Sequence, residues 1–275
     1  GYRTGLIGEW ELGSQPWTQG FDEFTGFVNA QEAANYFSPF VWQYFPNGIE
    51  DAATGTKKYS FRQTLYGNEA GNHEHYLPDV FMQAAHSFVR IHQPGRGNHY
   101  RPFFLLVNLP APRSATVGKD DFPVPTDAPF TDEPWPQAAK NRASLISRLD
   151  TSIGQLLEQL QQGGMTNNVA IFFSGAVAPR NFASTNLNFL KLPGEVCGGT
   201  DAAHLRAPML VRWPGHVPAG QVNPQPWSAA DFAAMALEIG FVNPPASSKL
   251  PLLLGNAAAP APKPAPSKPD GPPEK

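Results

Sequence analysis

The sequence predicts an α/β fold, with a mostly parallel sheet flanked by helices. Short, continuously apolar segments indicate buried strands, and two longer segments place apolar residues three and four positions apart, as in amphipathic helices. The two kinds of segment alternate along the chain, which favours a parallel sheet because parallel strands are usually joined through a helix. The 275 residues, of which 41 % are hydrophobic, are enough to bury a sizeable core.

The first half of the chain predicts one strand, a long loop region and one helix. Residues 4–8 are short, apolar and end in glycine, which indicates a strand. Residues 13–71 are rich in Gly, Asn, Pro and aromatic residues with little periodicity, and we expect long loops there. Residues 77–92 have apolar positions at helical spacing and carry Pro78 and Asp79 in the first turn, which predicts an amphipathic helix packed on a sheet.

The second half predicts three strands and two helices. Residues 103–109 are short and continuously apolar, as expected for a strand buried on both faces. The other expected elements are a proline-rich loop over 111–136, a helix over 138–162, a second buried strand over 169–173, a third strand over 208–213 and a short helix over 228–239. We assign residues 1–245 to one domain and residues 246–275 to a Pro- and Ala-rich tail.

Composition argues against several classes of function. The net charge of −3 implies no broad basic face, so nucleic acid is not expected as a partner. The single cysteine, Cys197, cannot form an internal disulfide. The densest apolar run, residues 103–107, is far shorter than the ~20 residues of a membrane-spanning helix, so membrane association is expected only indirectly, through partners.

Six segments carry motifs of a known family. They are GYRTGLIGEWELG at residues 1–13, GFDEF at 20–24, the helix at 76–91 with the PFFLLV strand after it, the helix at 144–160, the strand at 168–174, and LRAPMLVRWPG at 205–215. In this order they resemble segments of the type I sulfatases, in the alkaline phosphatase superfamily, from residue 1 to about residue 245. The resemblance implies a sulfatase-like core that lacks the first strands of the family sheet.

The resemblance also implies which chemistry to look for. Sulfatases of this type cleave sulfate esters with a formylglycine, made from a Cys or Ser in a CxPSR-like motif, and a divalent metal; these residues contain no such motif. At the matching positions Glu9 replaces a lysine, Glu11 and Arg113 replace histidines, and Gly175 and Ala176 replace an Asp and an Asn. A hard cation needs several oxygen ligands and a sulfate needs cationic partners. We therefore expect no catalytic residue, no metal and no cofactor.

The leading hypothesis is a non-catalytic sulfatase-like protein that serves as a structural or interaction subunit of a larger assembly. Because missing early strands would leave a sheet edge open, other protein subunits are expected to cover that edge. One alternative is a sulfuric ester hydrolase completed by a missing N-terminal segment. Another is a module that binds sulfated glycans or other anions through Arg113, His204 and Arg206. The resemblance favours the periplasm or the cell exterior, since these enzymes are commonly exported.

Three smaller features each have a functional and a structural interpretation. Glu9 and Glu11 are two residues apart, so at a strand end they would share a face, either for acid–base chemistry or as solvated or hydrogen-bonded acids. His73 and His75 lie in a loop with no third ligand at a recognisable metal-site spacing. The aromatic-rich segment 37–45 is either a docking surface or part of the packed interior.

Overall fold

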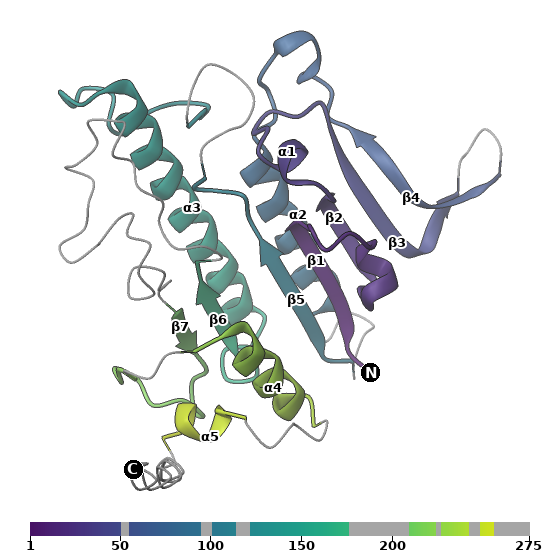
Figure 1. Ribbon diagram of the computed structural model, residues 1–275, viewed down its shortest axis with the longest axis vertical. Helices are drawn as coiled ribbons and strands as arrows, with labels where there is room; N and C mark the ends of the chain where they lie inside the picture. Colours follow the sequence, from purple (N-terminus) through teal and green to yellow (C-terminus); the bar gives the residue numbers. More distant parts are fainter. Residues whose placement is uncertain are drawn as a thin grey trace, which may run out of the picture. The chain divides into compact units, whose positions relative to one another are not determined.

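The chain forms two compact units in the computed structural model (Figure 1). The first unit comprises residues 1–166 and 174–209, and the second comprises residues 167–173 and 210–275. The structure describes residues 1–50, 55–94, 101–113, 122–175, 209–223, 227–241 and 248–255. Within these residues, no helix combines the length and the apolar character needed to cross a bilayer.

A five-stranded sheet is the centre of the first unit (Figure 1). Its strands, in chain order, are β1 (Arg3–Glu9), β2 (Glu23–Phe27), β3 (Phe40–Glu50), β4 (Lys57–Thr64) and β5 (Phe103–Asn108). The spatial order is β4-β3-β2-β1-β5. Strand β1 runs parallel to both β2 and β5, whereas β3 is antiparallel to β2 and to β4. The predicted α/β class is confirmed, with a parallel centre extended on one side by an antiparallel ribbon.

The prediction of long loops over residues 13–71 is wrong. This segment contains β2, β3, β4, the short helix α1 (Ala30–Ala33) and two 3-10 turns, η1 (Pro16–Gln19) and η2 (Glu69–Gly71). Strand β4, with the sequence KKYSFRQT, is almost entirely exposed, so it shows no hydrophobic periodicity to detect. It is defined instead by its backbone pairing with β3, which no single-strand pattern reveals.

The two predicted long helices are confirmed and pack against each other. Helix α2 (Leu77–His92) buries one face, including Phe81, against the core of the sheet, and α3 (Gln137–Gln162) packs on α2. The side-chain amide of Gln159 donates to the His86 carbonyl oxygen at 3.0 Å, which ties the two helices together. Gly163 and Gly164 follow the last turn of α3.

Strand β5 confirms the predicted strand, although its burial is incomplete. Its side chains are half-buried and Leu106 is 37 % exposed, so the expectation of burial on both faces is not met within the described residues. The side chains of Phe103, Leu105 and Val107 pack against the core cluster that contains Phe81 of α2. Strand β5 is one edge of the five-stranded sheet and β4 is the other.

The second unit contains a two-stranded sheet and two helices. These elements are β6 (Ile171–Ser174), β7 (Met209–Arg212), α4 (Ala229–Ile239) and α5 (Leu250–Leu253). The two strands and α4 match the predicted elements, and Ser228 begins α4 in a reciprocal capping arrangement with Asp231. The expected burial of β6 is wrong in part, because Phe173 is 47 % exposed. Helix α5 was not predicted, since four residues are too short for a readable helical period.

Two glycines allow β1 to approach its neighbours closely. A Cβ atom on Gly26 of β2 would lie 1.8 Å from the Gly8 carbonyl oxygen, and one on Gly8 would lie 2.0 Å from the Asn108 carbonyl oxygen. Gly8 also has a φ of 105°, a conformation that side chains rarely adopt. These contacts are backbone to backbone, so no side chain can move aside to relieve them.

We expect Gly26→Ala to destabilise the protein by about 3 kcal/mol, since the added methyl group must push two paired strands apart. Gly154→Ala is the matched control, because a Cβ at this position of α3 meets nothing within 4 Å and alanine favours a helix by about 1 kcal/mol. Urea unfolding followed by circular dichroism measures both changes. Equal stability of the two variants would contradict the close-approach argument.

Candidate functional site

The carboxyl ends of the parallel strands β1 and β5 carry a cluster of hydrogen-bonded polar side chains. Open α/β sheets usually bind ligands outside the carboxyl ends of their strands. Glu9 is the last residue of β1 and Asn108 is the last of β5. The Asn108 side-chain amide donates to the Glu9 carbonyl oxygen at 2.8 Å, so the two strand ends are linked directly.

Glu9 forms an ion pair with Arg113, which lies in the loop after β5. Arg113 Nη2 donates to Glu9 Oε1 at 3.0 Å. Glu9 is only 7 % exposed, whereas the Arg113 side chain is 40 % exposed. The sequence analysis identified both residues as replacements at family site positions, and the structure brings them into direct contact with each other.

Tyr36 fixes the backbone that carries Arg113. Its buried hydroxyl group donates to the Arg113 carbonyl oxygen at 2.5 Å, and its ring stacks on Tyr76 with the centroids 5.8 Å apart. Burial raises the pKa of the Tyr36 hydroxyl above its usual value, so this group stays a neutral donor at physiological pH. The Arg113 amide also donates to the Pro110 carbonyl oxygen at 3.0 Å, which closes a tight turn.

The Glu11 carboxyl affects the pKa of Glu9. Burial is the main cause that raises the pKa of Glu9, and hydrogen bonding to the Glu11 carboxyl raises that pKa further. The Arg113 guanidinium opposes both effects and lowers the pKa of Glu9. Glu11 itself is exposed. The pair is therefore a buried acid beside an exposed one.

The residues of this cluster do not fit the divalent metal that the resemblance implies. A calcium ion takes six to eight oxygen ligands, and a guanidinium on the central carboxylate competes with such an ion for the same oxygen. Asn108 directs its amide nitrogen, not its oxygen, at the Glu9 carbonyl group. Among the residues that the structure describes, no group of three or more His, Cys, Asp or Glu side chains is placed to hold a metal.

Most of the other residues proposed from the sequence lie outside the described part of the chain. Ala176, His204 and Arg206 lie outside the described residues, so their proposed roles stay predictions, as does the environment of Cys197. Gly175 is exposed after β6. Glycine supplies no side-chain ligand at that position.

The loop histidines and the aromatic segment both have structural roles. The His73 ring stacks on Phe37 with the centroids 4.2 Å apart, and His75 is exposed. Phe37 and Val41 are buried, which supports the packing interpretation of residues 37–45. Trp17 stacks on Tyr44 at 4.7 Å, so much of the aromatic surface of β3 is used inside the protein.

Sequence reasoning missed Tyr36 and Asn108 as parts of the site. Asn108 was detectable, because a polar residue that ends a buried parallel strand often points into the ligand-binding edge. Tyr36 lies in a segment that was expected to be loop, 77 positions from Arg113, and no local pattern signals such a contact.

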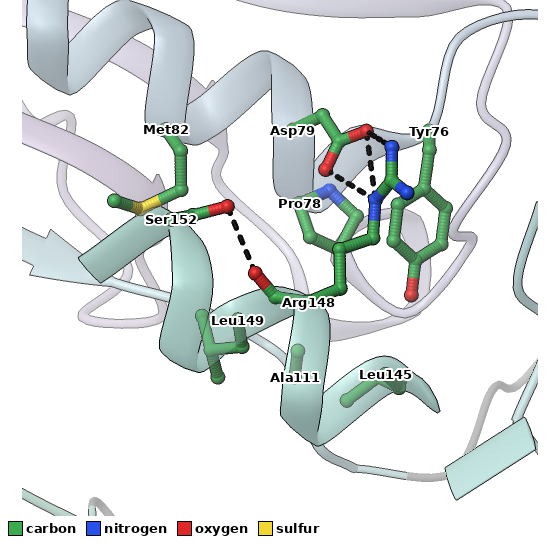
Figure 2. Close-up of a pocket in the computed structure, with 9 residues that line it drawn as sticks. All are labelled: Tyr76, Pro78, Asp79, Met82, Ala111, Leu145, Arg148, Leu149 and Ser152. Carbon is green, nitrogen blue, oxygen red and sulfur yellow. Dashed lines mark hydrogen bonds and ion pairs between the residues drawn. The ribbon is translucent and has the colours of Figure 1, made fainter. Parts of the chain in front are cut away.

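A separate hollow lies between α2 and α3 (Figure 2). Its cavity volume is about 10 Å³, roughly enough for one water molecule and too small for a substrate. Figure 2 shows the Arg148 guanidinium between Asp79 and the ring of Tyr76, and Arg148 Nε donates to Asp79 Oδ1 at 2.8 Å. We interpret this hollow as an imperfection in helix packing that an ion pair closes.

Comparison with known proteins decides the family. The family model described as Sulfatase matches residues 1–240. The chain belongs to the sulfatase family. The match covers the site at the ends of β1 and β5 and most of the described residues of both units.

Two curated relatives are N-acetylgalactosamine-6-sulfatases. The human protein is 30 % identical over 89 % of this chain and 44 % of its own length, and the dog protein is 28 % identical over 93 % of this chain and 47 % of its own length. The chain thus spans about half the length of the curated relatives that it matches.

Solved structures of sulfatases share the fold. The complex of Ps i-CgsB with k-i-k-neocarrahexaose has a TM-score of 0.60 and 24 % identity over 88 % of this chain and 51 % of that one. The PsFucS1 sulfatase from Pseudoalteromonas sp. has a TM-score of 0.61 and 18 % identity over 93 % of this chain and 53 % of that one. At this level of identity the likeness shows the sulfatase fold and carries no conclusion about substrate.

We expect Glu9→Gln to weaken the pH dependence of this protein's free energy of unfolding. The pKa of Glu9 in the folded state is raised above the usual 4.5, so this residue contributes stability below about pH 4.5 that is lost as the pH rises through the folded-state pKa. Glutamine cannot ionise. The free energy of unfolding should therefore fall less between pH 4.5 and about pH 7 in the variant than in the wild type.

Urea unfolding at a series of pH values measures this difference. Glu133→Gln is the matched control, because Glu133 is exposed and distant from the site in sequence. The interpretation fails if Glu9→Gln and Glu133→Gln show the same pH dependence as the wild type.

Proposed function

We propose that this sulfatase-family chain does not cleave sulfate esters at the ends of β1 and β5, and that it serves as a non-catalytic structural or interaction subunit of a larger assembly. The single observation that carries the proposal is the internal ion pair between Glu9 and Arg113. The resemblance places a cationic lysine and a histidine at these two positions, where a sulfate group would be held. In this chain a carboxylate takes the lysine's place and engages Arg113.

The electrostatic consequence supports the proposal. Where the family presents a cationic lysine, Glu9 supplies a carboxylate, which cannot attract a sulfate. The Arg113 guanidinium is already engaged by Glu9, so its charge is largely balanced before any ligand arrives. Gly175 removes a further oxygen ligand that the family's metal would use. The resemblance favours the periplasm or the cell exterior for such a subunit.

A sulfuric ester hydrolase is the second candidate function. Its specific support is the 30 % identity to human N-acetylgalactosamine-6-sulfatase over 89 % of this chain. In that case the nucleophile and most metal ligands lie outside residues 1–275, and Glu9 with Arg113 forms one wall of a modified site. Anion binding without catalysis would depend on His204 and Arg206 together with Arg113.

An activity assay separates the two functions. We expect the complete natural polypeptide to show no hydrolysis of 4-nitrophenyl sulfate or of N-acetylgalactosamine 6-sulfate, with or without calcium, because Glu9 takes the place of the family's lysine and engages Arg113. The human N-acetylgalactosamine-6-sulfatase in parallel verifies the assay. Hydrolysis by the natural protein that Arg113→Met abolishes would overturn the proposal. Native mass spectrometry of the same preparation should show association with other subunits.

A further inference from the structure

The antiparallel ribbon of β3 and β4 is interrupted in its outer half. The two strands are paired up to Tyr44, and the pairing resumes only at Ile49. Their partners on β4 are Ser60 and Lys58, which are separated by a single residue. Residues 45–48 of β3 therefore form a bulge outside the regular ladder. A bulge bends its strand and leaves the extra residues unpaired.

The bulge contains the one place in the 275 residues where an asparagine directly precedes a glycine, Asn47 and Gly48. Asn47 is exposed, and neither residue has a partner in the register of the described strands β3 and β4. Gly48 has a φ of 64°, a conformation that favours glycine, and a Cβ there would lie 3.3 Å from the Lys58 carbonyl oxygen. The bend of β3 therefore requires a glycine immediately after an exposed asparagine.

An asparagine in this setting is open to an intramolecular reaction. Asparagine is among the thermolabile residues of proteins. The backbone nitrogen of the next residue attacks the side-chain carbon Cγ and loses its proton, a succinimide ring closes, and the side-chain amide nitrogen leaves as ammonia. Water then opens the ring at either carbonyl group, which gives an aspartate or an isoaspartate. A following glycine favours the attack, because it has no Cβ to shield the nitrogen and its backbone rotates freely.

We propose that Asn47 is a modification site, at which water converts the neutral side-chain amide into a carboxylate without an enzyme. The site combines an exposed asparagine, a following glycine and a gap in the strand pairing. The new charge would arise next to the basic start of β4, since a Cβ on Gly48 would lie 3.4 Å from the Cβ of Lys57. This inference does not depend on whether the protein hydrolyses sulfate esters.

The isoaspartate form would change the outer end of the ribbon. It routes the main chain through the side-chain methylene group and so lengthens β3. The pairs that follow the bulge, Ile49 with Lys58 and Glu50 with Lys57, should then lose their register. The inner pairs up to Tyr44 lie before the modified residue and should keep theirs. The modification thus releases one end of the ribbon and leaves the rest of the sheet intact.

Mass spectrometry of the complete natural protein, aged at neutral pH in water labelled with a heavy oxygen isotope, tests the proposal. We expect position 47 to lose its amide nitrogen and gain a solvent oxygen, at a rate within about tenfold of that in the urea-unfolded chain, because unpaired residues open at little cost. Asn72 is the internal control, since it is exposed but precedes His73, and it should react more slowly. A reaction at position 47 that is slowed more than about tenfold by folding, or that is no faster than at Asn72, would overturn the proposal.

Two variants connect the chemistry to the ribbon. Asn47→Gln should abolish the conversion, because glutamine would have to close a larger and less favoured ring, whereas the matched variant Asn72→Gln should leave the conversion at position 47 unchanged. Hydrogen exchange of fresh and aged protein should show faster exchange at residues 49–50 and 57–58 after ageing of the wild type, and no change in Asn47→Gln. Unchanged exchange in the aged wild type, or the same loss of protection in aged Asn47→Gln, would contradict the release of the ribbon by this modification.

Discussion

The close approach of β1 to β2 and β5 is the constraint on which the rest of the first unit depends. It exists because Gly8 and Gly26 leave room for backbone atoms where any Cβ would collide. The register that follows sets Glu9 at the end of β1 beside Asn108 at the end of β5. The loop after β5 then returns Arg113 to Glu9. The polar cluster is thus a consequence of strand packing more than of any local motif.

The fold was predictable where one chemical pattern dominated. Helices α2 and α3 repeat apolar residues at helical spacing, and β5 is an unbroken apolar run. The antiparallel ribbon was not predictable, because β4 is exposed and its identity comes only from pairing with β3. A strand of that kind leaves no signal in its own residues, since backbone hydrogen bonds are the same for every side chain.

Only part of the site's membership, and none of its geometry, was predictable from the sequence. The resemblance brought Glu9, Glu11 and Arg113 together as replaced positions, although 104 residues separate Glu9 from Arg113. That Arg113 would bind Glu9, instead of remaining available to an anion, depends on the turn closed by Pro110 and on the Tyr36 hydroxyl group. The Tyr36 contact joins residues 77 positions apart, and the Pro110 contact depends on the backbone conformation of the turn. A comparison of sequence motifs reveals neither of them.

The energetics of the Glu9–Arg113 ion pair argue against a large contribution to the stability of the protein. Removing a carboxylate from water costs several kcal/mol, and a partly exposed guanidinium offsets only part of that cost. The raised pKa of Glu9 has burial as its largest cause, with Arg113 acting in the opposite direction. A pair with this balance adds little to stability. What it does is hold the loop after β5 in one place, with Tyr36 and Asn108 completing the support. The strand end at which the resemblance expects cationic partners for an anion thus carries an ion pair between Glu9 and Arg113 in this chain.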